Sequence, residues 1–131
     1  MQDPEVIICL PPRLPMIQGM VERLRNIADT ITIFGNMNHQ LTFSVNADTA
    51  MVQARFTDCQ HPSVGGHAAI IDENKTATVN VDAKQFQLFF QAVILKPQSV
   101  ICCLVSHRSA CIHMPLSEGA FITYYFSAKV M

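Results

Sequence analysis

The spacing of apolar and polar residues changes several times along the chain, and each change marks a predicted element. Residues 5–10 form a short apolar run that stops at Pro11 and is typical of a buried strand. From Pro15 to Asp29, apolar residues recur every three or four positions, which predicts an amphipathic helix with a proline in its first turn. The apolar stripe of this helix consists of Ile17, Met20, Val21, Leu24, Ile27 and Ala28.

After this helix the period of the pattern becomes two, as expected for strands whose alternate side chains face opposite sides. Residues 30–34 form the first of these predicted strands, and residues 35–38 form a turn. Residues 41–46 and 50–57 alternate in the same way, with a second turn between them at residues 46–48. We therefore predict a three-strand meander.

A loop and a second helix come next. The predicted loop at residues 58–75 contains Pro62 and a Gly-Gly pair, and the strand after it spans residues 76–81. Asp82 can cap a helix, and Gln85 completes the spacing of a capping box. The apolar stripe of this helix consists of Phe86, Phe89, Phe90 and Val93. Its polar side carries Lys84, Gln87 and Gln91.

The chain therefore repeats one order of elements: a strand, a helix and three strands. The last three predicted strands span residues 99–105, 110–115 and 120–126. We predict one α+β domain over residues 1–131, built from units 5–57 and 76–126 that the loop 58–75 joins. A chain of 131 residues that is 50% hydrophobic and 15% charged suits one such domain with a sizeable core.

Two known architectures use this doubled unit, and they imply different functions. In a DNA-clamp domain, two helices pack on curved antiparallel sheets, whereas in the vicinal-oxygen-chelate fold the strands of a cup carry metal ligands. Strand 5–10 offers only Glu5 as such a ligand. Strands 76–81 and 120–126 offer neither histidine nor carboxylate. The clamp is therefore favoured, with a metal enzyme or a general α+β binding module as alternatives.

The charge of the chain limits the partners that it can bind alone. Its formal net charge is −1, so tight, salt-driven binding to DNA is not expected of this chain by itself. No apolar run approaches the roughly 20 residues that span a membrane. The first residues also lack the basic and apolar stretches of a signal peptide, so we expect no membrane contact.

The cysteines and histidines offer few candidates for chemistry. Four of the five cysteines lie in apolar, strand-like runs and are interpreted as small core residues of a reduced intracellular protein: Cys9, Cys102, Cys103 and Cys111. Cys59, His61 and His67 share the predicted loop, but a closed zinc site needs four ligands. A polar loop is favoured. The alternatives are a zinc site that Cys111 and His113 complete from nearby, and a Cys–His nucleophile pair. We predict no catalytic residue, metal or cofactor, and we interpret His113 as a hydrogen-bonded strand residue.

Short segments in a fixed order carry a resemblance to a known family. They are Asp3–Val6, Leu10-Pro11, Met20–Ile27, Leu41–Phe43, Phe56–Asp58, Val81-Asp82, the second helix and Tyr125–Ala128. In this order they resemble the C-terminal domain of the Hus subunit of the nine-one-one checkpoint clamp, within the sliding-clamp family of the proliferating-cell nuclear antigen. The resemblance spans nearly the whole chain except residues 59–75. It covers only the second of the two domains in that subunit.

The resemblance implies a non-catalytic subunit of a heterotrimeric ring that is loaded around double-stranded DNA at damage sites in the nucleus. The implied partners are two other clamp subunits, a clamp loader, and recruited checkpoint and repair proteins. In such rings the helices line the central hole, and the matching positions are Arg23, Arg25, Lys84, Gln87 and Gln91. Their side chains suit loose, sequence-independent contact with phosphates, although Glu22 on the same face also fits an ordinary solvated surface.

The resemblance also assigns two strands to pairing with other domains. Strand 50–57 matches the edge that pairs with the next subunit in the ring. The residues that flank this pairing are Met51, Gln53 and Arg55. Strand 120–126 matches the one that joins the two domains of a subunit, and it is apolar on both faces, which equally fits a central core strand. The residues assigned to this junction are Ile122, Tyr124 and Phe126.

Overall fold

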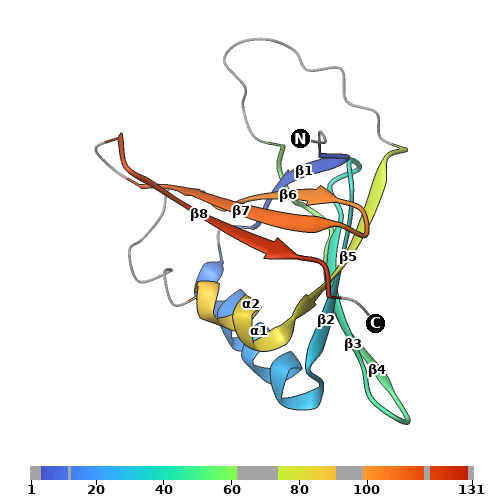
Figure 1. Ribbon diagram of the computed structural model, residues 1–131. Coiled ribbons are helices and arrows are strands. Elements are labelled where there is room, and N and C mark those ends of the chain that lie inside the picture. Colours follow the sequence, from blue (N-terminus) through green and yellow to red (C-terminus); the bar gives the residue numbers. More distant parts are fainter. Residues whose placement is uncertain (1–3, 12, 62–73, 91–98, 117–118, 130–131) are drawn as a thin grey trace.

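Two helices and two antiparallel sheets make up the described part of the chain (Figure 1). A computed structural model describes residues 4–11, 13–61, 74–90, 99–116 and 119–129. The elements in chain order are β1 (Val6–Cys9), α1 (Leu14–Ile27), β2 (Thr30–Asn36), β3 (Leu41–Asn46), β4 (Met51–Phe56), β5 (Thr76–Asp82), α2 (Ala83–Phe90), β6 (Ile101–Val105), β7 (Ser109–Pro115) and β8 (Phe121–Ser127). This order confirms the predicted α+β class and the predicted succession of a strand, a helix and three strands, twice over.

The two sheets exchange their first strands. Sheet A has the order β1-β6-β7-β8, and sheet B has the order β4-β3-β2-β5. Val6 of β1 pairs with Leu104 of β6, and Thr30 of β2 pairs with Asp82 of β5. The first strand of each repeated unit therefore lies in the sheet of the other unit, so neither unit forms a complete sheet from its own strands.

The helices lie in the angle between the sheets, next to each other (Figure 1). Helix α1 contacts β2 and β3 of sheet B, and α2 contacts β5 of sheet B and β8 of sheet A. The α2 cap is confirmed, because the Gln85 N–H donates to Asp82 Oδ1 at 3.0 Å. Helix α1 ends at Ile27 instead of the predicted Asp29, since Ala28 is already extended. The predicted residues Gln91 and Val93 lie outside the described residues.

The buried face of α1 is narrower than the predicted stripe. Ile17, Val21 and Leu24 are buried, as expected from their helical spacing. Met20 is only half-buried, and Ile27 is 42% exposed. The prediction that Ile27 belongs to the buried stripe was therefore wrong. Ile27 is the last residue of α1, and no other element buries its side chain there.

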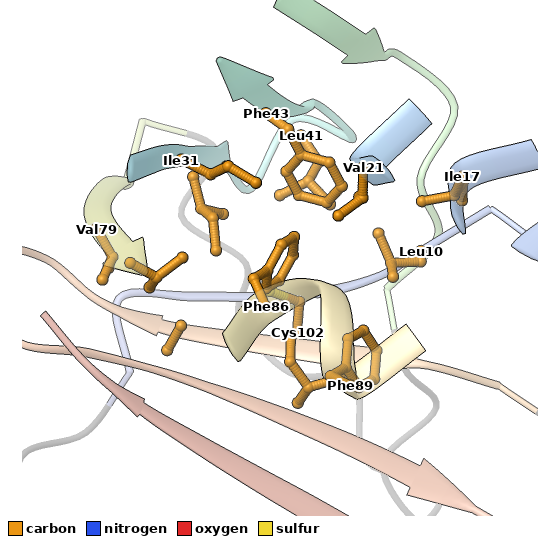
Figure 2. Close-up of a cluster of buried hydrophobic side chains, with 14 of the residues drawn as sticks. Leu10, Ile17, Val21, Ile31, Leu41, Phe43, Val79, Phe86, Phe89 and Cys102 are labelled. Atoms are coloured by element: carbon orange, nitrogen blue, oxygen red, sulfur yellow. The ribbon is translucent and has the colours of Figure 1, made fainter. Parts of the chain in front are cut away.

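Phe86 of α2 joins the two sheets in one core. Its side chain is fully buried, and Figure 2 shows it pointing from α2 into the cluster of apolar side chains. Its ring lies 5.2 Å from the ring of Phe43 in sheet B and 5.7 Å from that of Phe126 in sheet A, both at edge-on angles. Such edge-to-face pairs add to the stabilisation from burial alone.

The turn predicted at residues 35–38 begins too early, because Gly35 is a strand residue. It lies within β2, is buried and pairs with Leu41 of β3. A Cβ atom at this position would lie 3.1 Å from Leu104 Cδ1 and 3.1 Å from Val6 Cγ1. A side chain at this position would therefore crowd Leu104 and Val6, where β2 passes close to sheet A. The chain turns later, where His39 has a φ of 64°.

Substitution of Gly35 by alanine is expected to lower the free energy of unfolding by about 1–3 kcal/mol, because the added methyl overpacks this contact. Gly19 provides a matched control, since nothing lies within 4 Å of its Cβ position in α1. Gly19→Ala should raise the free energy of unfolding by about 0.5–1 kcal/mol. Urea denaturation of both variants measures these changes, and an unchanged stability of Gly35→Ala would contradict the close approach.

Candidate functional site

The polar sides of the two helices form the first candidate surface. On α1, Arg23 and Arg25 are exposed, and Glu22 is exposed beside them. On α2, Lys84 is exposed and Gln87 is half-buried. These side chains lie off the buried stripes of their helices, and Arg23 and Arg25, two positions apart, point to different sides of α1. Gln91, the fifth residue predicted for this surface, lies outside the described residues.

A cleft forms where the end of α1 meets the start of α2. It has a volume of about 260 Å³. The residues that line it are Arg25, Asp29, Asp82, Ala83, Lys84 and Lys129. Sequence reasoning missed Lys129, because a single lysine after the last strand belongs to no pattern and only the fold brings it to this place.

The edge of β4 is the second candidate surface. β4 is an outer strand of sheet B, and none of the described residues pairs with its outer side. The hairpin bond from Ala47 N–H to the Ala50 carbonyl sets the alternation of bonded and non-bonded pairs along β3 and β4. By this alternation, three residues direct their main-chain N–H and C=O groups away from β3: Met51, Gln53 and Arg55.

The edge of β8 is the third candidate surface. β8 is an outer strand of sheet A, and within the described chain its outer side makes no main-chain hydrogen bond. The bond from Leu116 N–H to the Ala120 carbonyl sets the alternation here. By this alternation, the residues of β8 with outward main-chain groups are Phe121, Thr123, Tyr125 and Ser127.

The three residues predicted for the domain junction have a different orientation. Ile122 and Tyr124 pack against the core, and Phe126 is buried. On the other face, Phe121 is 65% exposed and Tyr125 is 74% exposed. Within the described part of the chain, only the inner face of this strand is covered, so its role at a domain junction stays a prediction.

The other two sheet edges are closed by the chain itself. At β1, the Cys9 N–H donates to the Gln60 carbonyl at 2.8 Å. At β5, the His107 N–H donates to the Thr78 carbonyl at 2.7 Å, and Lys129 N–H donates to the Asn80 carbonyl at 2.7 Å. In contrast, the outer sides of β4 and β8 make no main-chain hydrogen bond in the described structure, which invites strand addition there.

Among the described residues, no histidine side chain is hydrogen-bonded to the Cys59 thiol. Cys59 is buried, which raises the pKa of its thiol to about 11, so the thiol stays protonated at neutral pH. Its Sγ is 4.0 Å from the Phe56 carbonyl oxygen. The ring of His61 lies 4.5 Å from that of His39, whose Nδ1 is 2.7 Å from the Cys59 carbonyl oxygen. His67 lies outside the described residues.

The remaining cysteines differ in burial from the prediction. Cys102 is fully buried, as expected, whereas Cys9, Cys103 and Cys111 are half-buried because they alternate to the other face of sheet A. His113 confirms the expected hydrogen-bonded strand residue, since its Nδ1 lies 3.0 Å from Thr123 Oγ1. Among the described residues, no group of three or more histidine, cysteine or carboxylate side chains could hold a metal ion. None of the described helices has the length and apolarity to cross a membrane.

Three comparisons with known proteins bear on these surfaces. A family model described as Hus1-like protein matches residues 1–130. The chain is 34% identical over 128 residues to "Checkpoint protein hus1 homolog" of Dictyostelium discoideum. This match covers 98% of this chain and 45% of that protein. It is 25% identical over 129 residues to "Checkpoint protein HUS1" of Homo sapiens, with 96% of this chain and 45% of that protein covered.

The fold comparison decides between the two architectures. The crystal structure of Proliferating Cellular Nuclear Antigen from Entamoeba histolytica superimposes with a TM-score of 0.77 at 17% sequence identity. The match covers 99% of this chain and 48% of that chain. The described elements thus have the fold of half a clamp subunit, and not that of the vicinal-oxygen-chelate enzymes. The chain spans less than half the length of these relatives.

Proposed function

Because the chain belongs to the Hus1-like family, we propose that it is the C-terminal half of a non-catalytic subunit in a DNA-damage checkpoint clamp. Residues 1–131 act in this proposal as a single clamp-like domain. The complete subunit joins two other clamp subunits in a heterotrimeric ring, which a clamp loader places around double-stranded DNA. The ring works in the nucleus by topology and by recruiting checkpoint and repair proteins.

The observation that carries this proposal is the pair of open edges on opposite sheets of a clamp fold. A ring needs each domain to pair with a neighbour on two sides, and β4 and β8 offer main-chain groups on two different sheets. We assign β4 to the neighbouring subunit, through Met51, Gln53 and Arg55. We assign β8 to the other domain of the same subunit, through the outward main-chain groups of Phe121, Thr123 and Tyr125 in place of the predicted Ile122, Tyr124 and Phe126.

The helix surface suits contact with DNA inside such a ring. Arg23, Arg25 and Lys84 supply positive charge on exposed, flexible side chains, and the half-buried Gln87 adds a polar group on α2. These groups bind phosphates without reading bases, often through water. A net charge of −1 keeps the binding of this chain alone weak, so retention on DNA depends on closure of the ring.

Co-purification tests the assembly directly. The full-length subunit, expressed with the other two clamp subunits of the same organism, is expected to elute as one complex with a single copy of each. The chain described here should be captured weakly by the neighbour that pairs with β4. A full-length subunit that elutes apart from both partners would contradict the proposed ring.

Gln53→Pro is expected to weaken the pairing between subunits. Proline removes the Gln53 N–H, which points to the open edge, and leaves the main-chain bonds between β3 and β4 intact. Loss of one such bond costs about 0.5–1.5 kcal/mol, or roughly a 2- to 12-fold lower affinity for the neighbour. Surface plasmon resonance on the purified subunits measures this change.

Gln53→Ala is the matched control, because it removes the side chain and keeps the N–H. It should bind the neighbour as the unchanged subunit does, and both variants should melt within a few degrees of it. Equal binding by the proline and alanine variants would argue against strand pairing at β4.

A further inference from the structure

Three elements bring positive charge to the cleft between α1 and α2. Arg25 comes from the last turn of α1, Lys84 from the first turn of α2, and Lys129 from the segment after β8. Residues that are far apart in the sequence therefore converge on one hollow of about 260 Å³. The cleft lies at the end of the polar helix surface, so it continues that surface toward the end of the chain.

The main chain holds Lys129 at this place. The Lys129 N–H donates to the Asn80 carbonyl at 2.7 Å, and the preceding Ala128 N–H donates to the Arg108 carbonyl at 2.8 Å. Asn80 is itself fixed, since its Oδ1 accepts a hydrogen bond of 2.7 Å from Thr32 Oγ1. The main chain of Lys129 is therefore held against β5 at Asn80, two residues before the capping residue Asp82. These hydrogen bonds fix its position.

The two carboxylates in the cleft, those of Asp29 and Asp82, offset only part of its positive charge. The Oδ1 atom of the Asp82 carboxylate accepts the Gln85 N–H. The main-chain carbonyl of Asp29 accepts the Ala83 N–H at 2.8 Å. Three cations against two carboxylates leave one net positive charge. Over the described residues, neither lysine forms an ion pair with a carboxylate. Because two N–H groups at the start of α2 are already bonded, the cationic side chains, and not the helix end, supply the attraction for an anion.

We propose that Arg25, Lys84 and Lys129 hold a backbone phosphate of the encircled DNA in this cleft. The inference rests on the proposed function and adds Lys129 to the residues that contact DNA. Lysine and arginine side chains on three sides suit a phosphodiester, which presents two charged oxygens and carries no sequence information. Waters that bridge the ammonium groups to the phosphate fit a cleft of this size.

Lys129→Gln in the reconstituted full-length ring tests this inference. DNA affinity is measured by fluorescence anisotropy over a series of salt concentrations. Loss of one phosphate contact should reduce the slope of log affinity against log salt by about one. Lys75→Gln is the matched control, because Lys75 is exposed and immediately precedes the first residue of β5, at the end of the strand away from the cleft. The control should keep the original slope, and both variants should keep the original melting temperature.

The outcomes separate the inference from the function on which it rests. A ring that binds DNA with the same slope after Lys129→Gln overturns the phosphate site and leaves the clamp intact. A ring of unchanged subunits that shows no salt-dependent DNA binding overturns both. Inorganic phosphate distinguishes a free anion from DNA. If phosphate at constant ionic strength raises the melting temperature only when Lys129 is present, and the DNA slope is unchanged, the DNA assignment is overturned.

Discussion

Replacing Arg23, Arg25 and Lys84 together by glutamine is expected to weaken DNA binding by the assembled ring roughly a hundredfold. Each side chain is exposed on the polar side of its helix and can reach a phosphate. A single charge pair at about 4 Å in water contributes about 1 kcal/mol, so three contacts contribute about 3 kcal/mol. The slope of log affinity against log salt should also fall by about three.

Charge reversal of the same residues gives a stronger test. Glutamate at these positions replaces attraction by repulsion, so the clamp loader should place far fewer rings on circular DNA. The control replaces Arg13, Lys75 and Arg108, three exposed cations outside this surface. It changes the net charge equally and should retain DNA. Normal loading of the reversed ring would refute the assignment of the helix surface to DNA.

Phe86→Ala is expected to lower the free energy of unfolding by about 3–5 kcal/mol. The side chain is fully buried, and its ring contacts those of Phe43, Phe90 and Phe126 at centroid distances of 5.2, 5.4 and 5.7 Å. Its removal leaves a cavity that neither sheet can fill, because each sheet is held by its own ladder of hydrogen bonds. Urea denaturation followed by circular dichroism measures the loss.

Leu88→Ala is the control within the same helix. Leu88 is 48% exposed, so its truncation should change the free energy of unfolding by about 0.5 kcal/mol or less. Phe86→Leu keeps most of the apolar volume and should lose much less than alanine. It keeps the comparison measurable should the alanine variant unfold. Similar losses for Phe86→Ala and Leu88→Ala would show that α2 does not join the sheets.

The periodic elements could be predicted from the sequence because each carries its own signal. Asp82 and Gln85 define the start of α2 locally, and their predicted capping bond is present. Phe86, Phe89 and Phe90 were predicted as the buried stripe of α2, and all three are fully buried. In such segments local propensity and tertiary burial favour the same structure.

The failures occur where tertiary contacts decide the outcome. Gly35 has the local character of a turn, but the approach of Leu104 and Val6 makes it a buried strand residue. Phe121 and Tyr125 have the apolar character of covered residues, yet their exposure depends on what lies beside the outer strand. No local pattern can supply these facts, because each depends on a segment that is distant in sequence.

The residues of the candidate surfaces likewise include some that the sequence predicted and one that it did not. Arg23, Arg25 and Lys84 were identified from helical spacing together with the family resemblance, and the structure places them on exposed helix faces. Lys129 could not be found in this way. Its relation to Arg25 and Lys84 exists only because Asn80 anchors it beside the start of α2.

The exchange of first strands between the sheets has a consequence for synthesis of the chain. β1 leaves the ribosome before the other elements of this domain, but Val6 meets Leu104 only after most of the domain has been translated. Such distant pairings are slow to form, and until then the apolar strands of the nascent chain stay uncovered. The domain must therefore fold late and in one cooperative event, which makes chaperone protection more important for it than for a protein whose repeats fold one after another.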